Sequence, residues 1–403
     1  MVLPLEDVKV LDFMWVMAGP AAVRYLADYG ATVVHVESAT RIDTARTLQP
    51  MRDKQAGPER SGVFANLNAG KLSLALNLAK PEAKDVIFRL VRWADIVTES
   101  YSPRAMRNWG LGYETLREVN PGIVMLSSCL NGQAGPWASL AGFGTMGAQL
   151  AGFGELAGWP DRPPAGPFGA YTDYIAPKFT VMALLSALDH RRRTGEGQYI
   201  DFSQAEASQQ FLGTALLDYT VNNHVQSRTG NRSSAAAPHA VFPAAGVDRW
   251  VAIAAETEAQ WQALCAAVGR TDWLTRPDCA SAAGRQAHRE ELEQGIAEWT
   301  SSRTVEDIEA ILQSARVPVH RVSDSRDLLA DSHLAARGHF VQVQHAEAGV
   351  APLESSRMRL SRTPSIPPGP APTIGQHTDH VLREILDMGD EAIIDLVAAG
   401  ALE

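Results

Sequence analysis

Apolar and polar positions along the first 40 residues predict a strand, a helix and a second strand. Residues 8–13 have the pattern of a buried strand, and Ala-Gly-Pro at residues 18–20 forms the turn after it. A helix is expected over residues 21–29, and Gly30 ends it at a position where glycine is common. The next strand is expected over residues 32–36.

The same alternation continues to about residue 222. Further strands are expected at residues 71–78, 95–99, 123–128 and 199–202, and helices at residues 81–93, 104–109, 113–119, 177–190 and 204–222. Strands that alternate with helices form parallel sheets with both faces covered. We therefore predict a large Rossmann-like α/β domain with a parallel sheet. No GxGxxG sequence follows the first strand, so a dinucleotide site has little support.

The pattern changes near Asn222, where a polar segment begins. Two antiparallel strands and three helices are expected next, at residues 240–242, 250–254, 257–268, 286–300 and 304–315. They predict a smaller α+β domain. The chain then has a helix, a strand, a proline-rich extended run and two closing helices, at residues 327–337, 340–344, 364–372, 378–386 and 390–398. The predicted organisation is residues 1–224 in the large domain, 225–325 in the small domain and 326–403 back in the large domain.

Composition narrows the class of protein. A length of 403 residues favours two domains, and a net charge of −10 argues against a nucleic-acid binder. Cys129, Cys265 and Cys279 are isolated, which is typical of a reducing cytoplasm. The N-terminus lacks the features of a signal peptide, and no apolar stretch reaches the roughly 18 residues that span a bilayer. We expect a cytoplasmic protein with no membrane and no nucleic-acid partner.

Metal and nucleophile motifs are absent from the sequence. The histidines are scattered, and the densest group, at residues 377–380, opens a helix where aspartate is a common cap. No GxSxG sequence and no P-loop occur. Cys129 follows an apolar strand and is expected in the core. We therefore expect no metal.

Asp173 stands at the end of a Gly- and Pro-rich segment, ahead of an apolar helix expected to begin at Pro177. Such a place can hold a carboxylate beside a pocket that admits little water. An aspartate before a helix is also an ordinary cap, and the local sequence leaves both interpretations open.

Four basic residues, Arg41, Lys71, Arg104 and Arg107, are expected on loops or strand ends of the large domain. Each alone is an ordinary exposed side chain. A cluster of them would suit an anionic ligand.

Segments spread over nearly the whole chain, in one order, carry a family resemblance. They are residues 10–13, 18–20, 26–37, 68–71, 94–99, 109–113, 120–121, 131–136, 193–198, 230–232, 317–318 and 371–378. In these segments the chain resembles the family III CoA transferases, the CaiB/BaiF group. The resemblance implies an interlocked homodimer of ring-like chains, with a Rossmann-like large domain built from both chain ends.

The resemblance also implies the chemistry. The family's catalytic carboxylate lies about twenty residues before an Arg-Thr-Gly-x-Gly-Gln turn, here residues 193–198, and this points to Asp173. It would attack an acyl-CoA and then carry CoA as an aspartyl thioester to a carboxylic acid. Acyl-CoA is thus a substrate, and no permanently bound cofactor is expected.

Residues that contact CoA in the family match this chain in part. Val16, Ala18 and Lys71 fit, although position 17 is Met where the family has a polar residue. Ser38 replaces a basic residue, which leaves Arg41 as a substitute.

Two further positions depart from the family pattern. Asn108 stands where the family often has Arg, with Arg107 beside it. The small-domain glycine-rich loop of oxalate-using members is absent, so oxalate is not expected as acceptor. His239 in that region could line the acyl pocket or have a structural role.

Two alternatives stay open. The α-methylacyl-CoA racemases of the same superfamily carry a His in an Ala-Gly-His-Asp segment about thirty residues before the Asp. Here Phe143 and Gly144 occupy the last two positions of that segment, so the base for proton abstraction is missing. We favour a transferase over a racemase, and both over a non-catalytic CoA-binding protein.

Overall fold

The computed structural model describes residues 2–403, which form two compact units. The larger unit contains residues 2–154, Gly166–Gln226 and His333–Glu403, and the smaller contains Glu155–Ala165 and Ser227–Ser332. Both chain ends therefore lie in the larger unit. The short segment Glu155–Ala165 belongs to the smaller unit, whereas the sequence pattern had left it inside the first domain.

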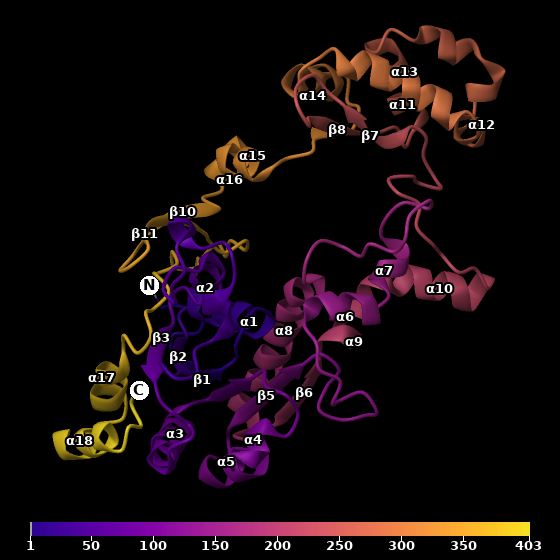
Figure 1. The fold of residues 1–403 in the computed structure, drawn as a ribbon. Helices are drawn as coiled ribbons and strands as arrows, with labels where there is room; N and C mark the ends of the chain where they lie inside the picture. Colours follow the sequence, from indigo (N-terminus) through magenta and orange to yellow (C-terminus); the bar gives the residue numbers. More distant parts are fainter. Residues whose placement is uncertain (1) are drawn as a thin grey trace. The chain divides into compact units, whose positions relative to one another are not determined.

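A six-stranded parallel sheet forms the centre of the larger unit (Figure 1). Its order is β3-β2-β1-β4-β5-β6, the Rossmann order. The strands are β1 Lys9–Phe13, β2 Thr32–Glu37, β3 Leu72–Ala75, β4 Ile96–Glu99, β5 Val124–Cys129 and β6 Tyr199–Ser203. The predicted α/β class with a parallel sheet is confirmed.

Helices cover the two faces of this sheet because successive strand residues point to opposite sides. On one face, Val10 and Val33 pack with helices α1 (Ala18–Asp28) and α8 (Tyr171–Thr194). On the other, Leu11 packs with α3 (Pro81–Trp93).

The start of α8 corrects a sequence-based expectation. The helix begins at Tyr171, so Asp173 lies in its first turn and Pro177 lies inside it. Proline lacks the N–H that would donate to the carbonyl oxygen four residues earlier, which is that of Asp173. Pro177 therefore does not mark the helix start. Because of Pro177, the backbone carbonyl oxygen of Asp173 does not receive the N–H hydrogen bond that a regular helix would supply.

The remaining elements of the larger unit are short. They are α2 Gly62–Leu67, α4 Ala105–Asn108, α5 Tyr113–Val119, α6 Gly144–Leu150, α9 Gln204–Gln209, α10 Gly213–Asn222, α17 Thr378–His380, α18 Asp390–Ala398 and the hairpin β10 Phe340–His345 with β11 Gly349–Glu354. Short 3-10 helices occur at Thr44–Thr47, Arg52–Lys54 and Gln210–Leu212, and Val381–Ile385 is a π-helix. The single helix expected over residues 204–222 is thus divided into α9 and α10.

The smaller unit has an antiparallel sheet, β7-β8-β9, and its own core. Its elements are β7 His239–Pro243, β8 Trp250–Ala254, β9 Val319–Arg321, α11 Glu258–Ala267, α12 Ala282–Ala287, α13 Arg289–Ser301, α14 Val305–Ser314 and α15 Ser325–Ala330, with 3-10 helices at Thr271–Thr275 and Pro277–Cys279. Trp261 and Trp273 are stacked in the core, with ring centroids 5.7 Å apart. Helices α7 (Phe153–Leu156) and α16 (Ser332–Ala336) lie where the chain passes between units.

None of the helices in residues 2–403 combines the length and apolar character that crossing a membrane requires.

Candidate active site

Asp173 is a buried carboxylate with no charged partner. Its side chain emerges from the first turn of α8, and the residue is 8% exposed. Burial alone raises its pKa to about 7, because water that would stabilise the charge is excluded. Within residues 2–403 no hydrogen bond or ion pair to this carboxylate is formed. It is therefore a poorly solvated carboxylate, which is a good nucleophile once ionised.

A pocket of about 210 Å³ surrounds Asp173 at the carboxyl edge of the sheet. The pocket is lined by residues 15–19 after β1, 100–103 after β4, 128–130 at the end of β5, the loop 138–144, Asp173 and Gln204. In parallel sheets ligands bind at this edge, where the strand order reverses. Five predicted site residues meet here, namely Val16, Ala18, Phe143, Gly144 and Asp173.

Gly144 allows the backbone of α6 to approach the Asp173 carboxylate. A Cβ added at Gly144 would lie 2.6 Å from Cγ and Oδ1 of Asp173. The hydroxyl of Thr172, beside Asp173, donates to the Gly144 carbonyl oxygen at 3.1 Å, which fixes the two segments together. A side chain at position 144 would therefore displace the Asp173 carboxylate from the place it has in this structure.

The turn after β1 is held in a rare conformation by a buried acid. Val16 has φ = 73°, in the left-handed region that a β-branched residue rarely adopts. Its N–H donates to Oδ1 of Asp43 at 2.9 Å, and the N–H of Trp15 donates to Oγ of Ser100 at 2.9 Å. These bonds maintain a strained turn at the pocket, as is common at functional sites.

Lys71 lies in the interior, and its predicted contact with CoA does not fit this position. Its side chain has no exposed surface, and Nζ donates to Oδ2 of Asp12 and to Oδ1 of Asn68, both at 2.9 Å. Burial opposes ionisation of Asp12, but Lys71 and His35 outweigh it and hold the Asp12 pKa well below its usual range. The amine of Lys71 thus neutralises a buried acid, and a ligand phosphate cannot reach it.

Arg41 lines a hollow of about 390 Å³ that adjoins the Asp173 pocket. The two hollows share Trp15, Tyr101 and Ser102 in their linings and are therefore adjacent, and together we call them the groove between Asp173 and Arg41. Trp15 and Tyr101 lie edge to face at 5.5 Å. Ser38, which replaces a basic residue of the family, accepts a hydrogen bond from the Arg41 N–H at 3.0 Å and so shapes the turn that presents Arg41.

Arg107 and His239 are not among the lining residues of the groove. Arg107 lines a third cavity, which shares only Ser102 with the groove. His239 belongs to the smaller unit, where its Nδ1 is hydrogen-bonded to the Asn231 carbonyl oxygen at 2.8 Å. Arg107 therefore does not line the Asp173 pocket, and the role of His239 at the acyl pocket stays a prediction.

Sequence reasoning missed several lining residues and misplaced one. Cys129 lines the pocket instead of lying in the core, and burial raises its pKa to about 11, so it is a neutral thiol. Trp15, Tyr101 and Ser102 were also missed. The expected strand ends at residues 13 and 99 could have indicated them, because neighbouring parallel strands end at the same edge.

The lining residues of the Asp173 pocket include no Lys, Arg or His. In the part of the chain that the structure describes, no group of three or more His, Cys, Asp and Glu side chains is placed to hold a metal ion.

The fold and pocket define a class, a Rossmann-type subunit with an unpaired carboxylate at the carboxyl edge of its sheet. The family model described as CoA-transferase family III matches residues 5–378, and the chain belongs to this family. The predicted membership is confirmed.

Relatives resemble the chain over nearly their whole length. A succinyl-CoA–D-citramalate CoA-transferase of Chloroflexus aurantiacus is 31% identical over 395 residues, 98% of this chain and 97% of that protein. A succinate–glutarate CoA-transferase of Agrobacterium fabrum is 30% identical over 384 residues, 95% of this chain and 96% of that protein. The crystal structure of a CaiB/BaiF family protein from Brucella suis has a TM-score of 0.88 and 28% identity, and covers 96% of this chain and 100% of that one.

Proposed function

We propose that the protein moves CoA from an acyl-CoA to a carboxylic acid with Asp173 as the nucleophile. The observation that carries the proposal is the unpaired, buried carboxylate of Asp173 at one end of the groove that has Arg41 near its other end. Membership of CoA-transferase family III supports the reaction class.

Every intermediate of the exchange is an activated acyl derivative, so the free energy of the thioester is not lost to hydrolysis. Asp173 attacks the thioester carbonyl, expels the CoA thiolate and forms a mixed anhydride. The thiolate then attacks the aspartyl carbonyl, releases the first acid and leaves an aspartyl-CoA thioester. The acceptor carboxylate attacks the aspartyl carbonyl of this thioester, expels the CoA thiolate and forms a second mixed anhydride. The thiolate then attacks the acceptor's carbonyl, which gives the new acyl-CoA and releases the Asp173 carboxylate. Water must be excluded because it would hydrolyse either intermediate.

CoA is proposed to lie along the groove, with its thioester at Asp173. Val16 and Ala18 line the end near the carboxylate, and Trp15 and Tyr101 form the walls between the two hollows. Arg41 is the cation available to the phosphates, and a single arginine can bind them in a bidentate manner.

The names of the two relatives suggest the first substrates to test. One acts on succinyl-CoA and D-citramalate, the other on succinate and glutarate. We propose succinyl-CoA as donor and a screen of mono- and dicarboxylic acids as acceptors, with products identified by mass spectrometry. No cation lines the Asp173 pocket, so the second carboxylate of a diacid would need a partner from outside that pocket.

Trapping tests the mechanism directly. The protein incubated with succinyl-CoA and hydroxylamine should yield a hydroxamate on Asp173, because hydroxylamine captures activated acyl groups on carboxylates. Peptide mapping by mass spectrometry locates the adduct. An adduct on another residue, or turnover with no adduct at all, would contradict the assignment.

The pH dependence of the first step follows from the pKa of Asp173, which is about 7. Only the ionised carboxylate attacks, so the single-turnover rate of CoA release should rise about tenfold for each pH unit below 7 and level off above it. Rapid-quench measurements from pH 5.5 to 8.5 provide the profile. A rate independent of pH over this range would show that the carboxylate is already ionised at pH 5.5.

A racemase reaction lacks support in the pocket. Proton exchange at an α-carbon needs a second base, and Phe143 occupies the position where a racemase has His. Phe143 lines the pocket, and the residue is 70% exposed. Rapid deuterium exchange at an α-methyl centre without an acid acceptor would favour the racemase instead.

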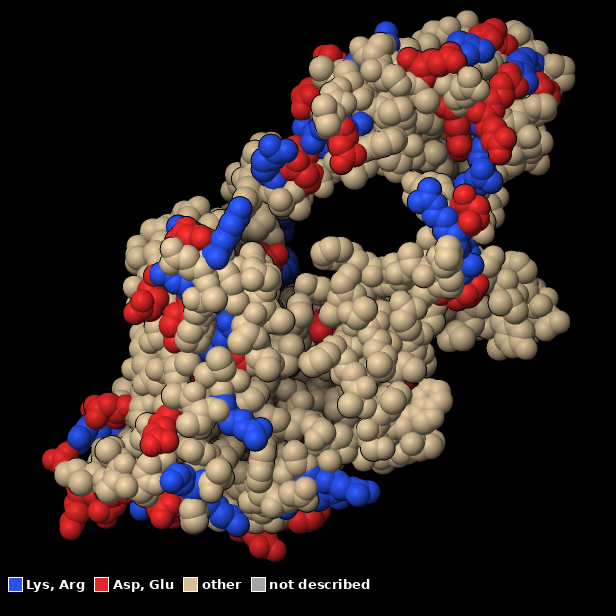
Figure 2. Space-filling model, viewed as in Figure 1, with Lys and Arg blue, Asp and Glu red and all other residues tan. Residues whose placement is uncertain are grey.

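The chain is also proposed to form the interlocked homodimer of its family in the cytoplasm. Leu216, Leu217 and Val221 on α10 are 56%, 63% and 76% exposed, which is unusual for a free surface. Figure 2 shows the surface of α10 drawn almost entirely in tan, with few charged residues. Light scattering should give the mass of two chains, and a monomer at micromolar concentration would contradict the proposal.

A further inference from the structure

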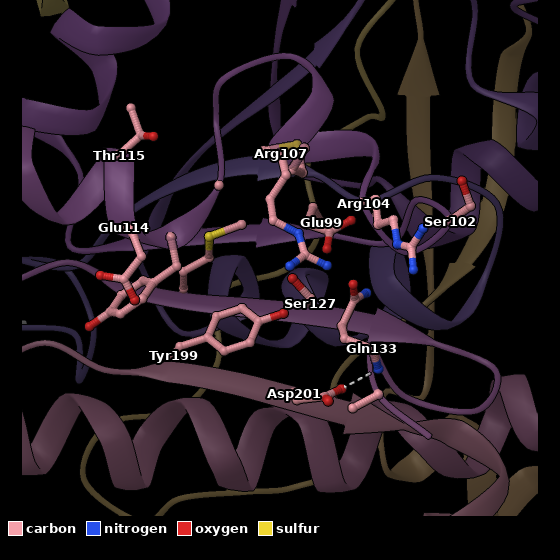
Figure 3. Close-up of a pocket in the computed structure, with 15 residues that line it drawn as sticks. Glu99, Ser102, Arg104, Arg107, Glu114, Thr115, Ser127, Gln133, Tyr199 and Asp201 are labelled. Carbon is pink, nitrogen blue, oxygen red and sulfur yellow. Dashed lines mark hydrogen bonds between the residues drawn. The ribbon is translucent and has the colours of Figure 1, made fainter. Parts of the chain in front are cut away.

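A separate cavity of about 560 Å³ lies beside strands β4, β5 and β6 (Figure 3). Glu99, Ser127 and Asp201 line it and are direct neighbours across these three strands. Neighbouring residues of parallel strands point to the same face, so the sheet itself builds this row of hydrogen-bonding groups. Burial raises the pKa of Glu99 to about 7, so near neutral pH this carboxyl group can both donate and accept hydrogen bonds.

Two arginines face the same cavity without a partner. Arg104 and Arg107 line it, and within residues 2–403 neither side chain forms an ion pair or a hydrogen bond. Figure 3 shows both guanidinium groups pointing into the cavity. Arg104 has φ = 77°, a left-handed conformation that is uncommon for a residue with a long side chain. Unpaired arginines in one cavity suit a bidentate anion such as phosphate.

Aromatic rings complete the lining. Tyr199 and Tyr113 line the cavity with ring centroids 5.5 Å apart, and Tyr199 is 39% exposed. In Figure 3, Tyr199 and Arg104 lie on different sides of the cavity. The volume is in the range of small-molecule sites and exceeds what a lone anion fills.

We propose that this cavity binds a nucleoside phosphate, as a site separate from the CoA groove. The phosphate would lie between Arg104 and Arg107. The sugar hydroxyls would hydrogen-bond to Glu99 and Asp201, and the base would pack on the exposed ring of Tyr199. This cavity brings the three chemistries together in one place, with two arginines, the carboxyl groups of Glu99 and Asp201 and an exposed aromatic ring in its lining.

Calorimetric titration of the full-length protein with AMP, ADP, adenosine and inorganic phosphate tests the proposal. Saturating CoA is added so that the groove at Arg41 is filled. AMP and ADP should bind once per chain, and adenosine and phosphate should each bind at least tenfold more weakly. The double variant R104Q/R107Q should weaken AMP binding at least tenfold, and Tyr199→Ala should also weaken it. Arg92→Gln, an exposed arginine of α3 outside the cavity, should change it less than twofold.

Several results would overturn the proposal. AMP binding that saturating CoA abolishes would place AMP in the CoA groove. Phosphate that binds as tightly as AMP would define an anion site only, and absence of AMP binding would refute the site. If the double variant no longer unfolds cooperatively on heating, its AMP affinity cannot be interpreted, and the test then rests on Tyr199→Ala. An unchanged AMP affinity in Tyr199→Ala refutes the site. The titration measures AMP binding and needs no transferase activity. If the protein does not bind CoA, the AMP affinities of the variants can still be compared without it. A failure of the proposed function therefore does not affect the result of this test.

Discussion

Replacing Asp173 by asparagine is expected to abolish CoA transfer, with a fall in kcat of at least about 10⁴-fold, the scale seen when a nucleophile is removed. Asparagine has almost the same shape, so the pocket and the groove to Arg41 should persist. The KM for succinyl-CoA or its Kd should therefore change only a few-fold. Steady-state assays by mass spectrometry and a CoA titration measure both quantities.

The matched control is Asp85→Asn, in which an exposed carboxylate on α3 loses an ion pair with Arg89. This variant should keep full activity, since exposed ion pairs contribute little. Transfer at more than about one hundredth of the normal rate in Asp173→Asn would refute nucleophilic catalysis by this residue.

Asp173→Asn should also be more stable to unfolding than the natural protein above pH 7. The pKa of Asp173 is about 7 in the folded chain and near 3.8 when unperturbed. Between these values the folded state binds more protons than the unfolded state, so stability falls as pH rises through this window. Asparagine carries no charge and avoids this cost, which is at most about 4 kcal/mol. Denaturant unfolding at pH 5 and pH 8 should show the gain growing with pH.

The arrangement of the sheet was predictable because each strand carries its own local signal. Residues 8–13 and 32–36 are apolar runs bounded by turns, and the segments between them have helical patterns, so a parallel sheet was the consistent solution. Helices α3, α5 and α18 begin and end where the pattern predicts. Local signals failed at α8, where Pro177 suggested a helix start although the helix already begins at Tyr171.

The sequence could predict only those site residues that strand ends and turns of the backbone bring to one edge of the sheet. Asp173, Val16 and Ala18 meet because strand ends and turns meet at one edge of the sheet. Lys71 could not be placed from its own segment, since alternation over residues 71–78 does not say what its amine faces. Its partner Asp12 belongs to a strand 59 positions away in sequence, and only tertiary structure brings the two together.

Gly144→Ala should be the second most damaging change, although it removes no chemical group. The new Cβ would lie 2.6 Å from the Asp173 carboxylate, closer than real Cβ contacts allow, so either the carboxylate or the start of α6 must move. A displacement of about 1 Å at a reacting atom can lower the rate about 10²-fold, which is the expected fall in kcat. The groove toward Arg41 is not altered, so the KM for acyl-CoA should stay within a few-fold. The fold should be retained, because alanine favours the helical conformation more than glycine.

Gly389→Ala is the matched control for this variant, since a Cβ there meets nothing within 4 Å and the residue has φ = −73°. It should keep normal kcat. The hydroxamate yield on Asp173 separates a displaced nucleophile from a damaged CoA site: in Gly144→Ala it should fall together with kcat while CoA affinity remains. A Gly144→Ala enzyme with normal kcat would mean that the carboxylate acts from a position other than the one beside α6. The close approach of Gly144 would then be a packing feature without a catalytic role.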